Sequence, residues 1–355
     1  MILQQMIKNF TVVIIGLPFF SFILPIYASD TTSTLVKKQV NLQSVVDESA
    51  SKEAQVWLRR IIDAPRKHNY TGIFVYSSAG HMETSRVVHM VGKEGEFERI
   101  EVLDGSPREV IRNNNEVKRY FPDRKTVVTG KRGLKKLFPA LLSEPFSNIN
   151  NNYLVKKVGR ERISNYDCQV IILESRDRMR YSQRLWIDVG TGLLLKAAVM
   201  DRDQVVEQYG FTQLEIDGEI DKELLTPQYS KRDTKLHITN PVSSKVVKNE
   251  LGWQVENLPS GFSKTNEVSR VFSGKSTPVG HITLSDGLAS VSVFIRPATQ
   301  NDPIENHEFY PPQGAINIYI RTVDDNVVTT IGEVPQATVM QIGNSVKTYK
   351  VKWVE

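Results

Sequence analysis

The chain has 355 residues, of which 40% are apolar, 24% charged and 8% aromatic. This length suggests about two domains, and the ordinary composition excludes a disordered, collagen-like or multi-span membrane protein. The single cysteine, Cys168, excludes an intrachain disulfide and a cysteine-rich metal site, while 45 Lys and Arg against 40 Asp and Glu leave a mild positive surplus.

Residues 1–28 have the parts of a secretory signal peptide. Lys8 is their only charge, an apolar stretch spans 10–26, and Ala28 offers a small residue at the cleavage point. The stretch contains two prolines and is short for a membrane span, so we expect cleavage after Ala28 and export to the periplasm. An exported protein with a positive surplus meets lipid phosphates, lipopolysaccharide and other proteins, so we expect no nucleic-acid partner.

Residues 29–225 are predicted to form a large domain of antiparallel strands. After a loose lead-in, Ser51 can cap a helix that ends at Pro65. Its apolar stripe consists of Ala54, Trp57, Leu58, Ile61 and Ile62. Strand-type runs follow at 72–76, 86–91, 97–103, 107–112, 116–121, 125–129, 153–158, 168–174, 181–188, 193–200 and 205–214. A curved sheet of roughly ten strands must close, split or be covered by helices.

A leucine-rich segment at 131–149 interrupts these strands. Apolar residues at helical spacing are Leu134, Leu137, Phe138, Leu141 and Leu142, and the adjoining basic cluster is Lys131, Arg132, Lys135 and Lys136. One interpretation is a helix that covers the sheet and leaves its cations in solvent. The other is an amphipathic lid over an apolar cavity, whose cations bind acidic lipid headgroups.

A second set of cations, Arg176, Arg178 and Arg180, lies near a turn. This set is predicted to form either a further cationic ridge for lipid or a charged edge strand in solvent.

Residues 226–250 hold two prolines and scattered polar residues without a sustained period, which indicates a linker. Residues 251–355 predict a small α+β domain. Its expected parts are a strand at 268–272, a hairpin turning at 285–287, strands at 316–321 and 327–331, and a closing helix that starts at Pro335 and carries Val339, Ile342 and Val346.

The sequence offers no motif for catalysis, for a cofactor or for a metal. Ser269 occupies the place of the glycine that a phosphate-binding loop at 274–276 needs, and no G-x-S-x-G elbow is present. Cys168 belongs to an apolar strand, which predicts a buried, inert thiol. His81 and His89 could share a strand face, but no spacing supplies a third ligand. We expect a protein that is not an enzyme.

The order of motifs resembles the RseB/MucB family of periplasmic sigma-E regulatory proteins. The motifs that carry the resemblance are YTGIFVY at 70–76, RVVH at 86–89, ERIEVLDGSPREVI at 98–111, YFPD at 120–123, YSQRLWIDVGTGLLL at 181–195, SDGLASVSVF at 285–294 and GEVP at 332–335. The resemblance covers roughly residues 50–350 in order, and it departs at 30–50 and after Val346.

The resemblance implies a fold and a role. The fold is α+β and mainly antiparallel β: a large N-terminal unclosed β-barrel, similar to the lipoprotein carriers LolA and LolB, with helices across its opening, and a small C-terminal domain. Family members are negative regulators that bind the periplasmic region of a membrane anti-sigma factor of the RseA or MucA type. Binding shields that factor from proteolysis, and lipid signals such as lipopolysaccharide release it.

Linkage gives this role a physical mechanism. A lipid releases the partner only if it prefers a conformation that binds the partner poorly. Phosphates at Lys131, Arg132, Lys135 and Lys136 could reorient the two domains about 226–250. The small domain supplies protein contacts, for which Trp253, Phe294 and Tyr319 are possible anchors, although core packing is the simpler role for each.

Two alternatives remain open, a carrier of lipid or lipoprotein that regulates nothing and an envelope scaffold that binds no lipid. The sequence also leaves homo-oligomerisation open.

Overall fold

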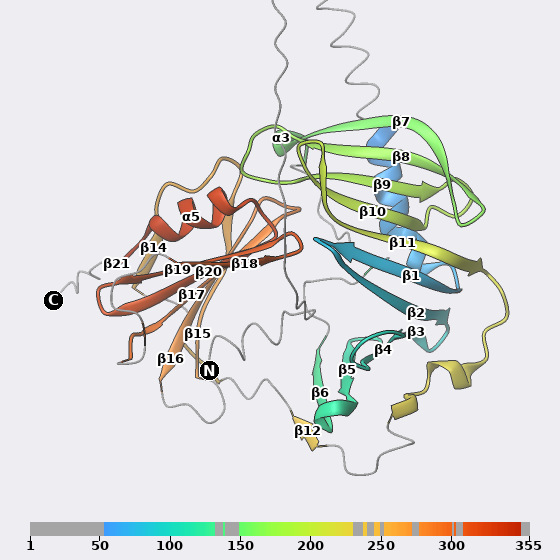
Figure 1. Ribbon diagram of the computed structural model, residues 1–355, viewed down its shortest axis with the longest axis horizontal. Coiled ribbons are helices and arrows are strands. Elements are labelled where there is room, and N and C mark those ends of the chain that lie inside the picture. Colours follow the sequence, from blue (N-terminus) through green and yellow to red (C-terminus); the bar gives the residue numbers. More distant parts are fainter. Residues whose placement is uncertain are drawn as a thin grey trace, which may run out of the picture.

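The computed structural model describes residues 53–131, 138, 149–229, 237–239, 245–248, 252–271, 277–299, 302 and 308–348. They form a large curved sheet and a smaller sheet that lie beside each other (Figure 1). Within this part of the chain, no helix is long and apolar enough to span a membrane.

The large sheet has the strand order β12-β6-β5-β4-β3-β2-β1-β11-β10-β9-β8-β7. Its strands are β1 (Tyr70–Ser78), β2 (His81–Gly92), β3 (Gly95–Val102), β4 (Glu109–Asn113), β5 (Glu116–Phe121), β6 (Thr126–Lys131), β7 (Tyr153–Ile163), β8 (Tyr166–Ser175), β9 (Ser182–Asp188), β10 (Leu194–Asp201), β11 (Gln204–Ile216) and β12 (His237–Thr239). Neighbours are antiparallel except β12 and β6, which are parallel. The edges β12 and β7 do not pair, so the barrel is unclosed, as predicted.

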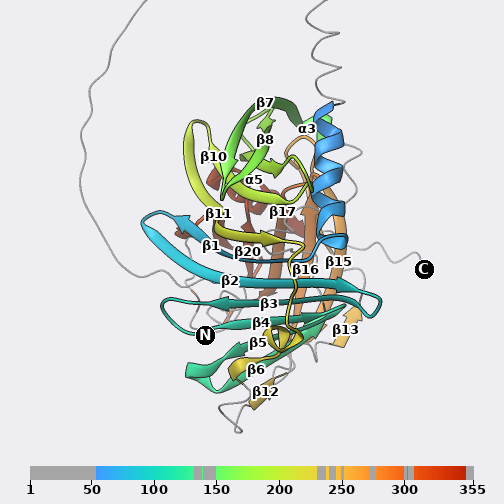
Figure 2. The ribbon, with the colours of Figure 1, turned by 90° about the vertical axis from the view of Figure 1, so that its right-hand side faces the viewer.

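Side-chain alternation gives this sheet an apolar inner face. Along β1 every second residue from Tyr70 to Ser78 is buried, as period-2 patterning requires. Residues 53–63 are helical and place Ala54, Leu58 and Ile61 in the same core, which confirms the predicted apolar stripe. Figure 2 shows this helix alongside the strands. The short helical elements of this domain are η1 (Ala64–Arg66), η2 (Pro122–Arg124), α3 (Ile149–Asn152) and η3 (Lys222–Leu225).

The small sheet has the order β13-β15-β16-β17-β20-β19-β18, and a two-stranded sheet joins β14 to β21. The strands are β13 (Lys245–Lys248), β14 (Trp253–Val255), β15 (Ser263–Val271), β16 (Pro278–Ser285), β17 (Ser290–Pro297), β18 (Glu308–Gln313), β19 (Ile316–Val323), β20 (Asn326–Gly332) and β21 (Val346–Thr348). Helix α5 (Gln336–Asn344) packs Val339 and Ile342 into the core of this sheet.

The structure differs from the predicted second domain in two places. The closing helix does not include Val346, because α5 ends at Asn344 and Val346 pairs with Val255 in the two-stranded sheet. The 226–250 segment is also not wholly irregular. It supplies β12 to the large sheet and β13 to the small sheet. Strands of three and four residues are too short to produce a visible period, so the sequence pattern missed both.

Candidate functional site

The inner face of the large sheet carries a group of aromatic rings, which we call the aromatic cluster: Phe74, Tyr76, Phe138, Tyr209 and Phe211. Phe74 and Tyr76 come from β1, and Tyr209 and Phe211 come from the adjacent β11. The Phe138 centroid lies 5.1 to 5.6 Å from those of Phe74, Phe211 and Tyr209, and Tyr76 lies 4.7 Å from Tyr209. Phe74, Tyr76, Phe138 and Phe211 are each less than 8% exposed, so these rings fill the inner face by packing against one another.

Phe138 belongs to the leucine-rich segment, and its side chain is 2% exposed against this face. The remainder of the predicted helical insertion lies outside the described residues. So do Arg132, Lys135 and Lys136 of the basic cluster, while Lys131 is the last residue of β6. Lipid binding by these four cations therefore stays a prediction.

A buried polar chain lies on the same face of the sheet, across β2, β3 and β4. Nε2 of His89 donates to the Pro65 carbonyl at 2.7 Å, and its Nδ1 lies 3.4 Å from a Glu98 carboxylate oxygen. Arg112 Nη1 lies 3.0 Å from the other oxygen of Glu98. The His89 ring stacks on Tyr70 with centroids 4.4 Å apart. These contacts tie the sheet to η1 and give the group a structural role.

The histidine pair considered for a metal is separated along one strand. His81 is the first residue of β2, and His89 lies eight residues further along the strand, about 26 Å away at 3.3 Å per residue, so the two cannot bind one ion. Among the described residues no group of three His, Cys, Asp or Glu is placed to hold a metal. Cys168 is fully buried, and burial raises the pKa of its thiol to about 12, as expected for an inert cysteine.

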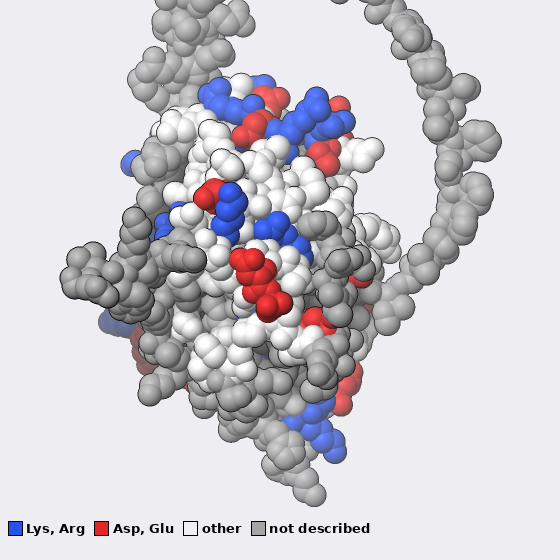
Figure 3. All heavy atoms as spheres, turned by 90° about the vertical axis from the view of Figure 1, so that its left-hand side faces the viewer, with Lys and Arg blue, Asp and Glu red and all other residues white. Residues whose placement is uncertain are grey.

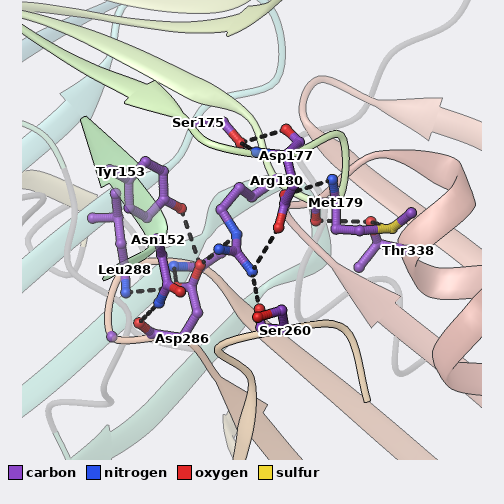
Figure 4. A network of polar contacts seen from close by, with 12 residues as sticks. Asn152, Tyr153, Ser175, Asp177, Met179, Arg180, Ser260, Asp286, Leu288 and Thr338 are labelled. Atoms are coloured by element: carbon purple, nitrogen blue, oxygen red, sulfur yellow. Dashed lines mark hydrogen bonds and ion pairs between the residues drawn. The ribbon is translucent and has the colours of Figure 1, made fainter. Parts of the chain in front are cut away.

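The three arginines at 176–180 form neither of the structures predicted for them. They lie in the loop that joins β8 to β9, not in an edge strand. Arg176 donates to the Asn150 carbonyl, and Arg178 is exposed. Arg180 instead turns inward, with its side chain 1% exposed, and points at the small domain (Figure 4).

Arg180 is the centre of what we call the interdomain clamp, formed by Asn152, Tyr153, Arg180, Ser260 and Asp286 (Figure 4). Arg180 Nε lies 3.1 Å from an Asp286 oxygen, and its Nη2 donates to the Ser260 carbonyl. The Tyr153 hydroxyl donates to Asp286 at 3.2 Å, and the Asn152 amide donates to the Asp286 carbonyl at 3.0 Å. The Asp286 side chain is fully buried, so both charges are paired away from solvent.

Asp286 also shapes the loop that carries it. One of its carboxylate oxygens accepts from the backbone N–H groups of Leu288 and Ala289 at 2.9 and 2.7 Å, which holds the β16–β17 turn. The same aspartate thus folds its own turn and pairs across the domain boundary. The sequence predicted this hairpin from 285–287 but gave no indication of its cationic partner, which is 106 residues earlier in the chain.

A second group of contacts joins the domains nearer the aromatic cluster. The Tyr76 hydroxyl donates to Glu207 Oε2 at 3.1 Å, and the backbone N–H of Ala315 donates to the same oxygen at 3.0 Å. Glu207 is 8% exposed. Two further hydrogen bonds between the domains come from the residues that flank Arg180 in the clamp. The Asn317 amide donates to the Tyr181 hydroxyl at 3.0 Å, and the Thr338 hydroxyl donates to the Met179 carbonyl at 2.8 Å (Figure 4).

The three aromatic residues considered as partner anchors occupy different environments. Tyr319 is 2% exposed within the small-domain core, and its hydroxyl donates to Asn344. Trp253 is half-buried against the same core. Phe294 is half-buried and stacks on His281 at 4.3 Å. Core packing accounts for Tyr319, and partner contact by Trp253 and Phe294 stays a prediction.

The surface of the small domain provides other apolar groups. Phe309 and Met340 are 38% and 40% exposed. Figure 3 shows the side of the molecule on which this domain lies, where uncharged residues cover a broad area between scattered cations and anions. A surface of this kind suits protein contact better than a polyanion.

Comparison with known proteins gives matches along most of the chain. The MucB/RseB N-terminal domain family matches residues 53–229, and the MucB/RseB C-terminal domain family matches residues 247–347. The sigma factor AlgU regulatory protein MucB of Pseudomonas aeruginosa is 28% identical over 311 residues, covering 85% of this chain and 93% of that protein. The sigma-E factor regulatory protein RseB of Escherichia coli is 25% identical over 301 residues, covering 84% and 92%.

Solved structures agree with these relatives. The crystal structure of MucB in complex with MucA(peri) is similar with a TM-score of 0.65 and 26% identity, covering 84% of this chain and all of that one. The MucA/MucB complex of Pseudomonas aeruginosa gives a TM-score of 0.67 and 25% identity over the same share.

Proposed function

Because this chain belongs to the MucB/RseB family, we propose that it is a negative regulator of an envelope-stress sigma factor. It acts by binding the periplasmic region of a membrane anti-sigma factor of the MucA or RseA type. The observation that carries this function is the likeness to MucB solved with MucA(peri), which extends through both domains and covers that whole chain. A simple carrier needs only the large sheet. Both domains of this chain match the MucB/RseB relatives.

The contacts between the domains support a binding protein that acts as one unit. The clamp buries a paired arginine and aspartate, and breaking such a pair leaves an uncompensated buried charge, which disfavours arrangements that pull the two domains apart. A partner that touches both domains would meet a preformed surface, which lowers the cost of ordering on binding. Shielding of the anti-sigma factor from a protease follows if the bound segment is the one that the protease cuts.

Lipid release completes the proposal. The aromatic cluster lines the inner face with packed apolar rings, and the basic cluster begins with Lys131 at the end of β6 of the same sheet. An amphiphile with an acidic headgroup matches both features. Such a ligand weakens partner binding only to the extent that the ligand itself binds more tightly to the partner-free conformation than to the partner-bound one.

We further propose the arrangement along the chain. Residues 1–28 are a signal peptide cleaved after Ala28, 29–225 the half-barrel domain, 226–250 the connecting segment and 251–355 the partner-binding domain. The mature protein acts in the periplasm, without catalysis and without a cofactor. Mass spectrometry of the protein from a periplasmic extract tests the cleavage, and a mature chain that begins elsewhere contradicts it.

The experiment that tests the function uses the mature chain and the purified periplasmic region of the anti-sigma factor from the same genome. We expect binding by titration calorimetry, protection of that region from the first protease of the cascade, and weaker binding when lipopolysaccharide is added. No binding and no protection would contradict the regulatory function. Binding of lipid alone would favour the carrier.

The basic cluster is tested in the same assay. Replacement of Lys131, Arg132, Lys135 and Lys136 by Ala should leave anti-sigma binding intact and abolish its response to lipopolysaccharide. The control removes equal charge from exposed sites elsewhere, at Arg160, Arg162, Arg202 and Lys222. If the control and the test variant respond alike, the cluster has no special role.

A further inference from the structure

The two groups of contacts between the domains differ in what they touch. The interdomain clamp pairs Arg180 with Asp286. The guanidinium carbon of Arg180 lies 5.8 and 5.2 Å from the ring centroids of Tyr153 and Phe262, and neither ring belongs to the aromatic cluster. The second group includes Tyr76, which is itself a member of the cluster. One tyrosine therefore takes part both in the inner face and in the attachment of the small domain.

Glu207 is the residue that links Tyr76 to the small domain. Its Oε2 accepts from the Tyr76 hydroxyl and from the Ala315 backbone N–H, so one oxygen joins a ring of the large sheet to a turn of the small domain. Glu207 lies two residues before Tyr209 on β11 and is paired with Ser78 of β1. It thus stands at the end of the inner face, directly beside the cluster.

Gly314 sets how closely the turn approaches. It has a φ of +60°, which favours glycine, and a Cβ at this position would overlap Glu207 Oε2 and lie 2.5 Å from the Tyr76 hydroxyl. The turn between β18 and β19 is therefore seated on these two side chains, with no room for a larger residue. Any displacement of the Tyr76 hydroxyl or of Glu207 changes the surface on which the turn rests.

We propose that Tyr76, Glu207 and the Gly314–Ala315 turn form a bridge that couples the packing of the aromatic cluster to the attachment of the small domain. When the rings around Phe138 rearrange, the Tyr76 hydroxyl moves, Glu207 loses one of its donors, and the Ala315 N–H is held less well. The clamp at Arg180 stays in place and serves as the fixed point. The use of this bridge in lipid-triggered release rests on the proposed function, whereas the coupling itself does not.

Hydrogen exchange of the Ala315 amide tests the coupling without any ligand. The change Phe138→Leu is made in the mature chain to perturb the aromatic cluster. If the Phe138→Leu variant does not fold, Phe74→Leu is used in its place. We expect exchange at Ala315 to rise about fivefold, which corresponds to roughly 1 kcal/mol of coupling. In the Tyr76→Phe background, which keeps the ring and removes the hydroxyl, the same change should raise exchange less than about twofold.

Two controls make the result specific. Tyr209→Phe removes a hydroxyl from the neighbouring ring of the cluster, and in that background the fivefold response should persist. The Ala289 amide, which donates to Asp286 in the clamp, should exchange at an unchanged rate throughout. A response of equal size in the Tyr76→Phe and parent backgrounds, or no response in either, overturns the bridge.

The outcome is separate from that of the regulatory function. A chain that passes the exchange test but binds no anti-sigma region keeps the bridge and contradicts only the proposed function. A chain that binds that region but shows no difference between the backgrounds contradicts only the bridge.

Discussion

Replacement of Asp286 by Asn should lower the free energy of unfolding and make the two domains unfold separately. The amide keeps an oxygen that can accept from the Leu288 and Ala289 N–H groups, so the turn itself should persist. What is lost is the negative charge beside Arg180, whose side chain is 1% exposed. A buried cation then remains without its main partner, which costs about 3–5 kcal/mol in general.

The structure places this variant at the lower end of that range. Arg180 still donates to the Ser260 carbonyl, and Asp177 lies 3.5 Å from its Nη2. We therefore expect a loss of about 3 kcal/mol in the free energy of unfolding. The double variant Arg180→Met with Asp286→Asn removes the unpaired charge as well, and it should recover to within about 1 kcal/mol of the parent chain.

The assay is equilibrium urea unfolding of the mature chain, followed by circular dichroism and by tryptophan fluorescence. Trp57 and Trp186 report on the large sheet and Trp253 on the small domain, so loss of the clamp should split one transition into two. Asp302→Asn is the control, because its pair with Arg296 lies within the small domain and is partly exposed. It should cost at most about 1 kcal/mol without splitting the transition.

The reasoning is refuted if Asp286→Asn unfolds within about 0.5 kcal/mol of the parent chain. It is also refuted if the double variant is as unstable as the two single losses added together. Either result would mean that the buried pair contributes nothing specific to the attachment of the domains.

Three further predictions concern single positions. Gly261→Ala should lower the free energy of unfolding, measured in urea, by about 1–3 kcal/mol, because Gly261 has a φ of +81° and a Cβ would overlap the Asn152 side chain of the clamp. Gly287→Ala is the control and should cost less, because Gly287 has a φ of +99° but open space around it. Iodoacetamide at pH 8 should leave Cys168 unmodified in the native chain, since its thiol has a pKa of about 12, and stoichiometric labelling seen by mass spectrometry would contradict this. Burial raises the pKa of Tyr153 and Tyr209 well above the ordinary value of 10.0, so the folded state holds these protons more tightly than the unfolded state. Stability should be constant up to about pH 9 and fall as the pH rises through 10 and beyond, and an unchanged urea midpoint between pH 8 and 10.5 would argue against it.

Sequence patterns determined much of the architecture. Strand-type runs located β1 to β11, and the apolar stripe at Ala54, Leu58 and Ile61 located the first helix. The hairpin turn at 285–287 was visible because the pair Asp286-Gly287 favours it, and Gly287 has a φ of +99°. These features depend on neighbours in the chain, and local chemistry is what a sequence displays directly.

Only the tertiary structure decided how the domains meet. Arg180 was predicted to belong to a cationic ridge for lipid or to a charged edge strand in solvent, yet it is buried against Asp286. No sequence motif included Glu207, yet it joins Tyr76 to Ala315. Each of these contacts joins residues more than 100 positions apart, and no period or spacing carries that information. A charged side chain holds two domains together only when the fold excludes water from it and supplies an opposite partner. The residue type alone could not show whether a given charge is solvated or buried and paired.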